Sequence, residues 1–129
     1  MIIDVDPGID DAMAIFYAIR RPGIVLEALT TTFGNTDTAI ATENALRVLE
    51  LLDRPDIPVA KGVRRSFIHP YVRRADHVHG SNAIGDIELP EPKIRPTDEH
   101  ASDLITRMAK ENPGEITLCS VGPVTNLVH

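Results

Sequence analysis

Short runs of β-branched and other apolar residues alternate along this chain with longer segments of helical periodicity. The runs that predict strands cover residues 2–6, 24–32, 57–60 and 116–121. The helical segments cover residues 10–20, 37–52 and 98–110, and another helix starts after residue 122. Such alternation predicts right-handed βαβ units, so we expect an α/β fold with a parallel, Rossmann-like sheet and helices on both faces.

Three further patterns lead to expectations about burial. The helix over residues 10–20 is apolar on nearly all sides, which predicts that it is well buried. Residues 61–96 have no clear period and contain several prolines, which is typical of a functional or mobile segment. The arginine pairs are expected on the solvated surface, and they lie at residues 20–21, 64–65 and 73–74.

The length of the chain bounds the number of domains. Its 129 residues suit a single α/β domain over residues 1–129. Hydrophobic residues make up 43% of the sequence, enough for a packed core and too many for a disordered chain. The last helical segment has barely one turn before the sequence stops. We therefore expect the N-terminal part of a larger domain, that is, a truncated form of the complete fold.

Charge and cysteine content limit the classes of partner. The formal net charge of −6 argues against nucleic acid, because phosphate binding needs a basic surface. The single cysteine, Cys119, excludes an intrachain disulfide and fits a reducing compartment. The first residues lack a secretory signal pattern, and no apolar run approaches the ~20 residues of a membrane span. These features predict a soluble cytoplasmic protein with no membrane partner.

Four carboxylates crowd into eight residues, namely Asp4, Asp6, Asp10 and Asp11 in the segment DVDPGIDD. At ~4 Å and an effective dielectric constant of ~20, two like charges repel by roughly 4 kcal/mol. Crowded carboxylates must therefore point apart, bind protons or share a cation. Helix capping by Asp10 and a favourable helix dipole at Asp11 account for two of them without a metal. Asp4 and Asp6 remain, on one side of a strand, where buried carboxylates without partners are costly.

A shared cation accounts for the whole cluster. Asp6 ends the first strand, at the edge where open α/β sheets bind ligands. The turn at residues 7–8 directs Asp11 back to the same point, and the turn at Val121 could offer a backbone carbonyl. Carboxylate oxygens are hard ligands, which favours Ca²⁺ or Mg²⁺ over Zn²⁺. Because a cation can orient a water molecule while a carboxylate takes its proton, the cluster predicts metal-assisted hydrolysis.

This cluster resembles the DxDPGxDD signature of the inosine–uridine preferring nucleoside hydrolases. Three further segments resemble motifs of that family in the same order: residues 30–35 (TTTFGN), 77–80 (HVHG) and 117–126 (TLCSVGPVTN). The resemblance covers the whole chain. It implies hydrolysis of the N-glycosidic bond of a ribonucleoside to ribose and a free nucleobase, a reaction of purine and pyrimidine salvage. It also implies a homo-oligomer, either a dimer or a tetramer.

The resemblance implies a calcium site. Asp6 and Asp11 would ligate Ca²⁺ together with the backbone carbonyl of Val121. Asp6 would also act as the catalytic general base toward a calcium-bound water. Asp4 would lie behind these ligands and support them.

The resemblance also implies substrate contacts. Asp10 would hydrogen-bond the ribose hydroxyls, and Asn35 would line the ribose pocket. His79 would lie near the nucleobase on a mobile loop, although an ordinary surface histidine is the alternative. The other histidines of this part of the chain are expected at the surface, and they are His69, His77 and His100.

Two alternatives remain open at this point. Asp4 and Asp6 also fit the D-x-D pair of a haloacid-dehalogenase-like phosphatase, although Asp10 and Asp11 have no place in that scheme. The chain could also be a non-catalytic fragment or a pseudoenzyme module. The remaining ligands and the leaving-group acid of the family have no counterpart in this sequence. We therefore expect the full-length protein to be an enzyme and the 129-residue chain alone to be inactive.

Overall fold

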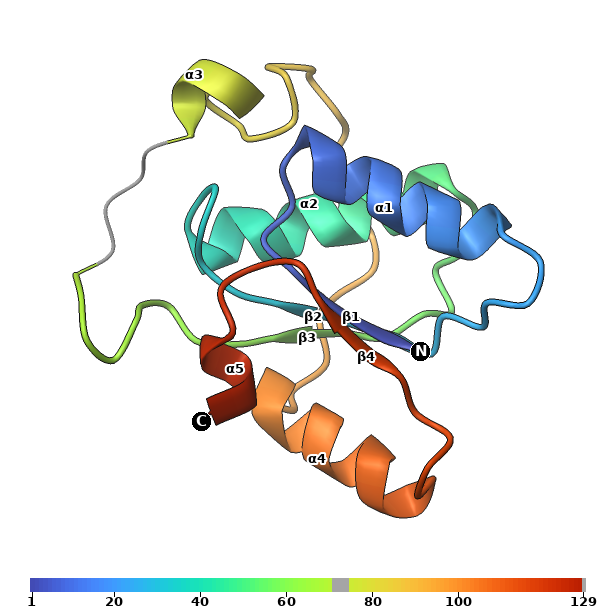
Figure 1. Ribbon diagram of the computed structural model, residues 1–129. Coiled ribbons are helices and arrows are strands. Elements are labelled where there is room, and N and C mark those ends of the chain that lie inside the picture. The colour runs from blue at the N-terminus through green and yellow to red at the C-terminus, as the bar shows by residue number, and fades with distance from the viewer. Residues whose placement is uncertain (71–74, 129) are drawn as a thin grey trace.

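The computed structural model describes residues 1–70 and 75–128, and its strands form one parallel sheet (Figure 1). Within these residues the strands are β1 (Ile2–Val5), β2 (Ala28–Thr31), β3 (Val59–Lys61) and β4 (Leu118–Ser120). Their order across the sheet is β3-β2-β1-β4, and all neighbouring strands are parallel. The predicted parallel α/β fold is confirmed.

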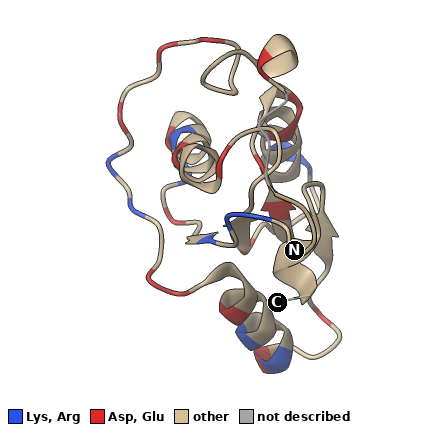
Figure 2. Ribbon diagram, turned by 90° about the vertical axis from the view of Figure 1, so that its left-hand side faces the viewer, with Lys and Arg blue, Asp and Glu red and all other residues tan. Residues whose placement is uncertain are grey.

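Helices cover both faces of the sheet, as the alternation predicts. The helices in chain order are α1 (Ile9–Arg20), α2 (Thr38–Leu51), α3 (Asp76–His79), α4 (Ala101–Glu111) and α5 (Thr125–Val128). Figure 1 shows α1 and α2 on one face and α4 and α5 on the other. Helix α4 carries both acidic and basic residues (Figure 2), and its Arg107 pairs with Glu111 and with Glu99, which precedes the helix.

Each face of the sheet has its own apolar core, because successive strand residues point to opposite sides. Ile3 and Val5 of β1 belong to the larger core, together with Ile15 of α1 and Leu49 of α2. Ile2 belongs to the smaller core with residues of α4. Each fully buried Ile or Leu stabilises the fold by about 1.5–3 kcal/mol relative to an exposed one. The same alternation puts Asp4 on the side of α4 and α5.

The strand order creates a switch point next to β1. From β1 the chain moves outward through β2 to β3 on one side and then returns to place β4 on the other side. The connections on the two sides of β1 thus leave in opposite directions, which opens a crevice at the carboxyl ends of β1 and β4. Residues that follow these two strands are therefore positioned to bind a ligand.

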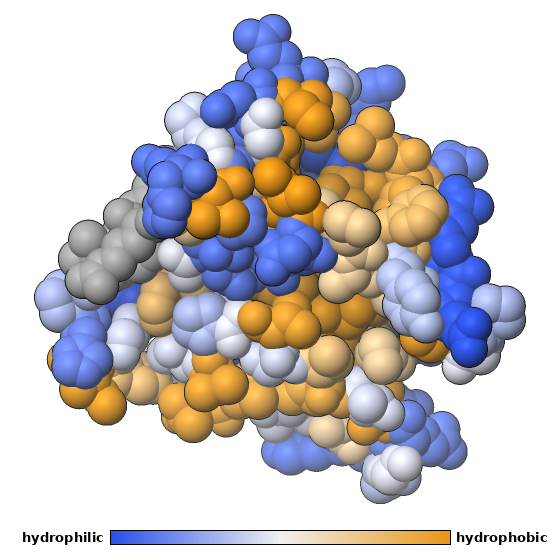
Figure 3. Space-filling model, turned by 45° about the horizontal axis from the view of Figure 1, so that its top comes forward, coloured by the Kyte–Doolittle hydropathy of each residue, from blue (hydrophilic) through white to orange (hydrophobic). Residues whose placement is uncertain are grey.

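Two local expectations about α1 are wrong. Helix α1 begins at Ile9 with Gly8 at its N-cap, so Asp10 lies inside the first turn and does not cap the helix. The helix is also not buried on all sides, since Met13 is 68% exposed and Phe16 and Tyr17 are exposed beside it. Figure 3 shows hydrophobic side chains at the surface on this side of the molecule. Apolar residues occur on both faces of α1, so the sequence pattern alone does not show which face packs on the sheet and which is exposed.

The second strand is shorter than expected, because β2 begins only at Ala28. Before it, the backbone of Val25 and Glu27 bonds to Met1, with Met1 N donating to the Val25 carbonyl (2.7 Å) and Glu27 N to the Met1 carbonyl (2.9 Å). The described residues of the segment 61–96, which are 61–70 and 75–96, are largely irregular as predicted, apart from the end of β3 and the short helix α3. They are nevertheless tied to α2, since Glu50 accepts hydrogen bonds from the amides of Lys93 (2.6 Å) and Ile94 (2.8 Å).

Most surface expectations hold. His69 and His77 are exposed, and so are the arginine pairs at residues 20–21 and 64–65, whereas the pair at residues 73–74 lies outside the described residues. His100 differs from its expectation, because it is half-buried and caps α4 by accepting the amide of Ser102. Across residues 1–70 and 75–128, none of the helices combines the length and apolar character needed to cross a bilayer.

Candidate functional site

The four aspartates of the cluster divide into an inner and an outer set. Asp4, Asp6 and Asp11 are buried, with exposed fractions of 0%, 5% and 5%. Asp10 is exposed. The structure therefore brings three carboxylates into the interior at the carboxyl end of β1 and leaves the fourth at the surface.

Asp6 is enclosed by two glycines from neighbouring loops. A Cβ atom on Gly34, after β2, would collide with Asp6 Oδ2, and one on Gly122, after β4, would lie 2.7 Å from Oδ1. Glycine is therefore required at both positions for the loops to approach this carboxylate. The backbone amide of Asn35 donates a hydrogen bond to Asp6 Oδ2 at 2.6 Å.

Asn35 joins the two carboxylates that were predicted to share a cation. Its Nδ2 donates to Asp11 Oδ2 at 3.2 Å, while its backbone amide holds Asp6. Asp11 Oδ2 also accepts the amide of Gly8 at 3.0 Å, which satisfies a free donor at the start of α1. Asp6 and Asp11 thus come together as expected from the turn at residues 7–8, and Asn35, which the resemblance assigned to the ribose pocket, contacts both of them.

The electrostatics of this pair favour protons or a cation. Burial raises the pKa of Asp6 to about 7, with the Asn35 amide opposing the shift and the negative charge of Asp11 adding to it. Burial likewise raises the pKa of Asp11, against the hydrogen bond from Gly8. Among the described residues, neither carboxylate forms an ion pair with a lysine or an arginine. The lysine and arginine side chains of the described residues therefore supply no positive charge next to Asp6 and Asp11.

Asp4 has a different environment, because other side chains satisfy it. Its Oδ1 accepts hydrogen bonds from Thr30 Oγ1 (2.6 Å) and Asn126 Nδ2 (2.8 Å), and its Oδ2 accepts a longer one from Ser120 Oγ (3.4 Å). Burial raises the pKa of Asp4, and these three hydrogen bonds oppose the shift. The position of Asp4 behind Asp6 agrees with a supporting role.

Asn126 of α5 received no role from the sequence beyond its place in a motif. Its Nδ2 also donates to the carbonyl of Thr31 at 3.0 Å, and its Oδ1 accepts the amide of Val63 at 2.9 Å. Gly62 permits this approach, since a Cβ there would collide with the amide of Asn126. A single buried side chain thus joins β1, β2, α5 and the loop after β3. A polar residue in a buried position was the available signal.

The turn after β4 lies against Asp6 as predicted. The backbone amide of Val121 donates to the carbonyl of Asp4 at 2.9 Å, which extends the pairing of β4 with β1. The close approach of Gly122 to Asp6 Oδ1 follows from that pairing. The side chain of Val121 is exposed, so any role in ligand binding falls to its backbone.

His79 lies over the turn between β1 and α1. It is buried, and its Nδ1 accepts the backbone amide of Ile9 at 3.3 Å. Its Nε2 lies 3.8 Å from Asp10 Oδ1, the exposed carboxylate of the cluster. A Cβ on Gly8 would approach the imidazole to 2.9 Å. His79 is therefore not an ordinary surface histidine, and it lies beside Asp10 at the start of α1.

The donor set fits a hard divalent cation in kind. Asp6 and Asp11 offer buried carboxylate oxygens that form no ion pair with a described lysine or arginine, and such oxygens are ligands that Ca²⁺ and Mg²⁺ prefer. Within the part of the chain that the structure describes, no three His, Cys, Asp or Glu side chains are arranged to hold a metal. Asp6 and Asp11 are therefore two candidate ligands, fewer than the roughly six to eight oxygens that a cation such as Ca²⁺ takes.

Comparisons with a family model, with curated proteins and with solved structures each find matches among nucleoside hydrolases or nucleosidases. The chain matches the family model "Inosine-uridine preferring nucleoside hydrolase" over residues 1–129. It is 48% identical to "Probable uridine nucleosidase 2" of Arabidopsis thaliana, over 98% of this chain and 40% of that protein. It resembles the solved structure "Plant nucleoside hydrolase - PpNRh1 enzyme", with a TM-score of 0.90 and 47% identity, over 98% of this chain and 40% of that one.

A second solved structure has a different stated preference. The "Purine-Preferring Ribonucleoside Hydrolase from Gardnerella vaginalis" gives a TM-score of 0.94 at 34% identity, over 98% of this chain and 41% of that one. The chain thus spans about 40% of the length of the relatives that it matches.

Proposed function

Because the chain belongs to the inosine–uridine preferring nucleoside hydrolase family, we propose that it contributes to hydrolysis of the N-glycosidic bond of a ribonucleoside, which releases ribose and a free nucleobase. Family membership favours this reaction over the phosphatase alternative. The observation that carries the proposal is the buried pair of Asp6 and Asp11, held together by Asn35 at the switch point of the sheet. Relatives named for uridine and for purines leave the nucleobase open.

Asp6 is proposed to act as the general base. Burial raises its pKa to about 7 in the protein without a cation, and a bound Ca²⁺ would lower that pKa, so Asp6 would be a deprotonated carboxylate able to accept a proton from an attacking water. The backbone amide of Asn35 donates a hydrogen bond to Asp6 Oδ2 at 2.6 Å, so we propose that Oδ1 accepts the proton of the water. The glycines at positions 34 and 122 hold the loops against both oxygens and fix the direction of the carboxylate.

Calcium is proposed as the cation of this site. Held by Asp6, Asp11 and the Val121 carbonyl, Ca²⁺ would supply positive charge that orients a water molecule and ribose hydroxyls. Asp11 is kept in place for this role by its hydrogen bonds from Gly8 and Asn35. The negative charges of the cluster also stabilise the oxocarbenium-like character that develops on the ribose.

The substrate is proposed to enter from the side of His79 and Asp10. Asp10 is exposed on the first turn of α1, where it can accept hydrogen bonds from ribose hydroxyls. Asn35, beside Asp11, is proposed to line the ribose pocket. His79, which contacts the start of α1, is proposed to lie beside the nucleobase. Holding the ribose at several points positions its anomeric carbon for the attacking water.

The proposal extends to the state of the whole protein. We propose activity for a protein that carries this chain within a family domain of full length, and no activity for residues 1–129 alone, since the described ligand set is partial. We also propose a cytoplasmic location and a homo-oligomer, a dimer or a tetramer, and the exposed apolar side chains of α1 support the oligomer.

Release of reducing sugar from inosine and uridine, with calcium supplied, tests the function. We expect release by the full-length protein and none by residues 1–129. Sugar release by the isolated chain would contradict the proposed incompleteness of the site. Failure of the full-length protein on purine and pyrimidine ribonucleosides alike would contradict the reaction itself.

A further inference from the structure

We propose that Asn44 on α2 is a positioning residue that anchors the His79 loop, here residues 79–87, over the turn between β1 and α1. The inference rests on the proposed function, because it concerns how the nucleobase side of that site is held in place. Neither Asn44 nor its partner Asn82 lies in the segments that pointed to the family.

The His79 loop is shaped by its own side chains. Asn82 Oδ1 accepts the backbone amides of Ile84 (3.0 Å) and Asp86 (2.9 Å), and Asn82 Nδ2 donates to the carbonyl of Ile87 (2.9 Å). Two non-glycine residues of the loop, Ala83 and Asp86, have positive φ angles of 65° and 56°. Such conformations persist only where surrounding contacts fix them, so Asn82 is the residue that holds this loop in shape.

One end of the loop contacts the start of α1. The amide of Gly85 donates to the carbonyl of His79 at 2.7 Å, which links the turn to the imidazole-bearing residue. His79 in turn accepts the amide of Ile9. A Cβ on Gly85 would lie 3.5 Å from the Ile9 side chain, so the loop also packs against this first residue of α1. A displacement of the turn would therefore move His79 relative to Asp10.

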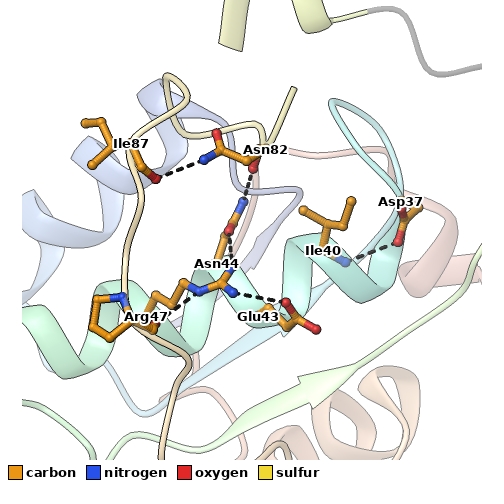
Figure 4. Close-up of polar contacts among 8 residues, drawn as sticks. Asp37, Ile40, Glu43, Asn44, Arg47, Asn82 and Ile87 are labelled. Atoms are coloured by element: carbon orange, nitrogen blue, oxygen red, sulfur yellow. Dashed lines mark hydrogen bonds and ion pairs between the residues drawn. The ribbon is translucent and has the colours of Figure 1, made fainter. Parts of the chain in front are cut away.

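The middle of the loop, at Asn82, is fixed by Asn44 (Figure 4). Asn44 is 0% exposed on α2, and its Nδ2 donates to the backbone carbonyl of Asn82 at 2.9 Å. Its Oδ1 accepts Arg47 at 3.1 Å, and Arg47 is paired with Glu43. The amide is thus held with its NH₂ group toward the loop. Helix α2 packs on the sheet through its buried face, so it offers a rigid support that the irregular loop lacks.

Loss of this anchor has a specific expected consequence. Without the Asn44 donor, the carbonyl of Asn82 loses this partner, and the His79 loop is no longer held to α2 at Asn82. The carboxylates that carry out the chemistry are held by other loops, which Asn44 does not contact. We therefore expect weaker substrate binding with little change in turnover.

The test compares Asn44→Asp with Asn112→Asp in the full-length protein. Asn44→Asp keeps the shape and the acceptor for Arg47 but removes the donor to Asn82. Asn112→Asp removes a similar bond, from Nδ2 to the carbonyl of Met108 at 3.0 Å, and changes the charge equally, at the far end of α4. In Asn44→Asp, KM for inosine or uridine should rise about tenfold and kcat should stay within about twofold, as expected when one buried polar group loses its partner.

Amide hydrogen exchange gives a readout that needs no activity. Exchange at residues 79–86 should be about tenfold faster in Asn44→Asp than in the wild type and unchanged in Asn112→Asp. Asn44→Ala, which also removes the donor to the Asn82 carbonyl but adds no charge, provides a second variant with the same expected pattern should Asn44→Asp fold poorly. Unchanged exchange in the loop would overturn the anchor, and faster exchange with unchanged KM would overturn the positioning role. A wild-type protein without hydrolysis would contradict the proposed function, while exchange would still decide whether Asn44 anchors the loop.

Discussion

Asp4 and Asp6 lie two residues apart along the chain at the carboxyl end of β1, both buried, yet their partners differ in kind. Three side-chain donors from three segments surround Asp4. Asp6 has one strong donor, the amide of Asn35, and faces the like charge of Asp11. A buried carboxylate with enough donors is a fixed structural element, whereas one with too few remains available to a proton or a cation. The comparison separates the supporting aspartate from the reactive one.

The largest expected effect concerns Asp6. Asp6→Asn should lower kcat about 10²–10⁴-fold, because it removes the proposed general base and a ligand charge. The same change removes repulsion with Asp11, so the melting temperature without calcium should stay the same or rise. Steady-state assays and thermal unfolding measure the two effects. Near-normal activity of this variant, or a melting temperature below that of the wild type, would contradict the roles that the comparison assigns to Asp4 and Asp6.

The pH dependence of stability should also reflect Asp6. Its pKa is about 7 in the folded protein against 3.8 as the ordinary value, so the folded state holds a proton that the unfolded state releases. Stability without calcium should therefore fall as pH rises from about 4 to about 7, by up to about 1.4 kcal/mol per pH unit for one such group, and then level off. Burial of Asp4 and Asp11 acts in the same direction.

Urea unfolding between pH 5 and pH 8, in the presence of a chelator, measures this slope. Calcium should restore stability mainly at the upper end of the range, because it binds the deprotonated carboxylates. Asp6→Asn should flatten the slope. A wild-type profile that is flat or rises through this range would show that the buried carboxylates are neutralised by something other than protons.

Asp4→Asn should mainly affect stability. Its new NH₂ group would face at least one of the donors from Thr30, Asn126 and Ser120, and a buried mismatch of this kind costs about 1–3 kcal/mol. Activity should fall by less than in Asp6→Asn. Denaturant unfolding and kcat measured on the same preparations compare the two positions directly. Loss of activity at full stability would place Asp4 among the reactive groups.

The smallest effect is expected at Ser120. Its bond to Asp4 is 3.4 Å long, against 2.6 Å for Thr30, so Ser120→Ala should cost about 0.5 kcal/mol and Thr30→Val about 1 kcal/mol or more. Ser120→Ala also removes the bond from Ser120 Oγ to the Gly122 carbonyl (3.3 Å), but neither variant removes a hydrogen bond to the Asp6 side chain, so both should keep kcat. Equal costs in urea unfolding would indicate that bond length does not rank the donors around Asp4.

Much of the fold follows from local patterns in the sequence. The β-branched runs predict β1 and β4, and the position of Asp6 after the first run is enough to place it at the ligand-binding edge of a parallel sheet. The pairing of Asp6 with Asp11 follows from the short turn between them. These are features that neighbouring residues decide.

The features that sequence analysis missed depend on residues far apart in the chain. Asn126 meets Asp4 across 122 positions, and Asn44 meets Asn82 across 38, so no local period could reveal either contact. The outer face of α1 was misjudged for a related reason, because burial of an apolar helix depends on what packs against it. The N-cap at Gly8 was missed because a glycine without a side chain gives no capping signal.

The pairing of β1 with β4 has a consequence for how the protein is made. Asp4 and its partner Ser120 are separated by 116 residues, so one side of β1 stays unpaired until the segment that contains β4 has been made. At typical rates of about 5–20 residues per second, that delay is roughly 6–23 s. The site at the end of β1 is therefore assembled only after β4 has emerged, and the exposed edge of β1 is available to chaperones in the interval.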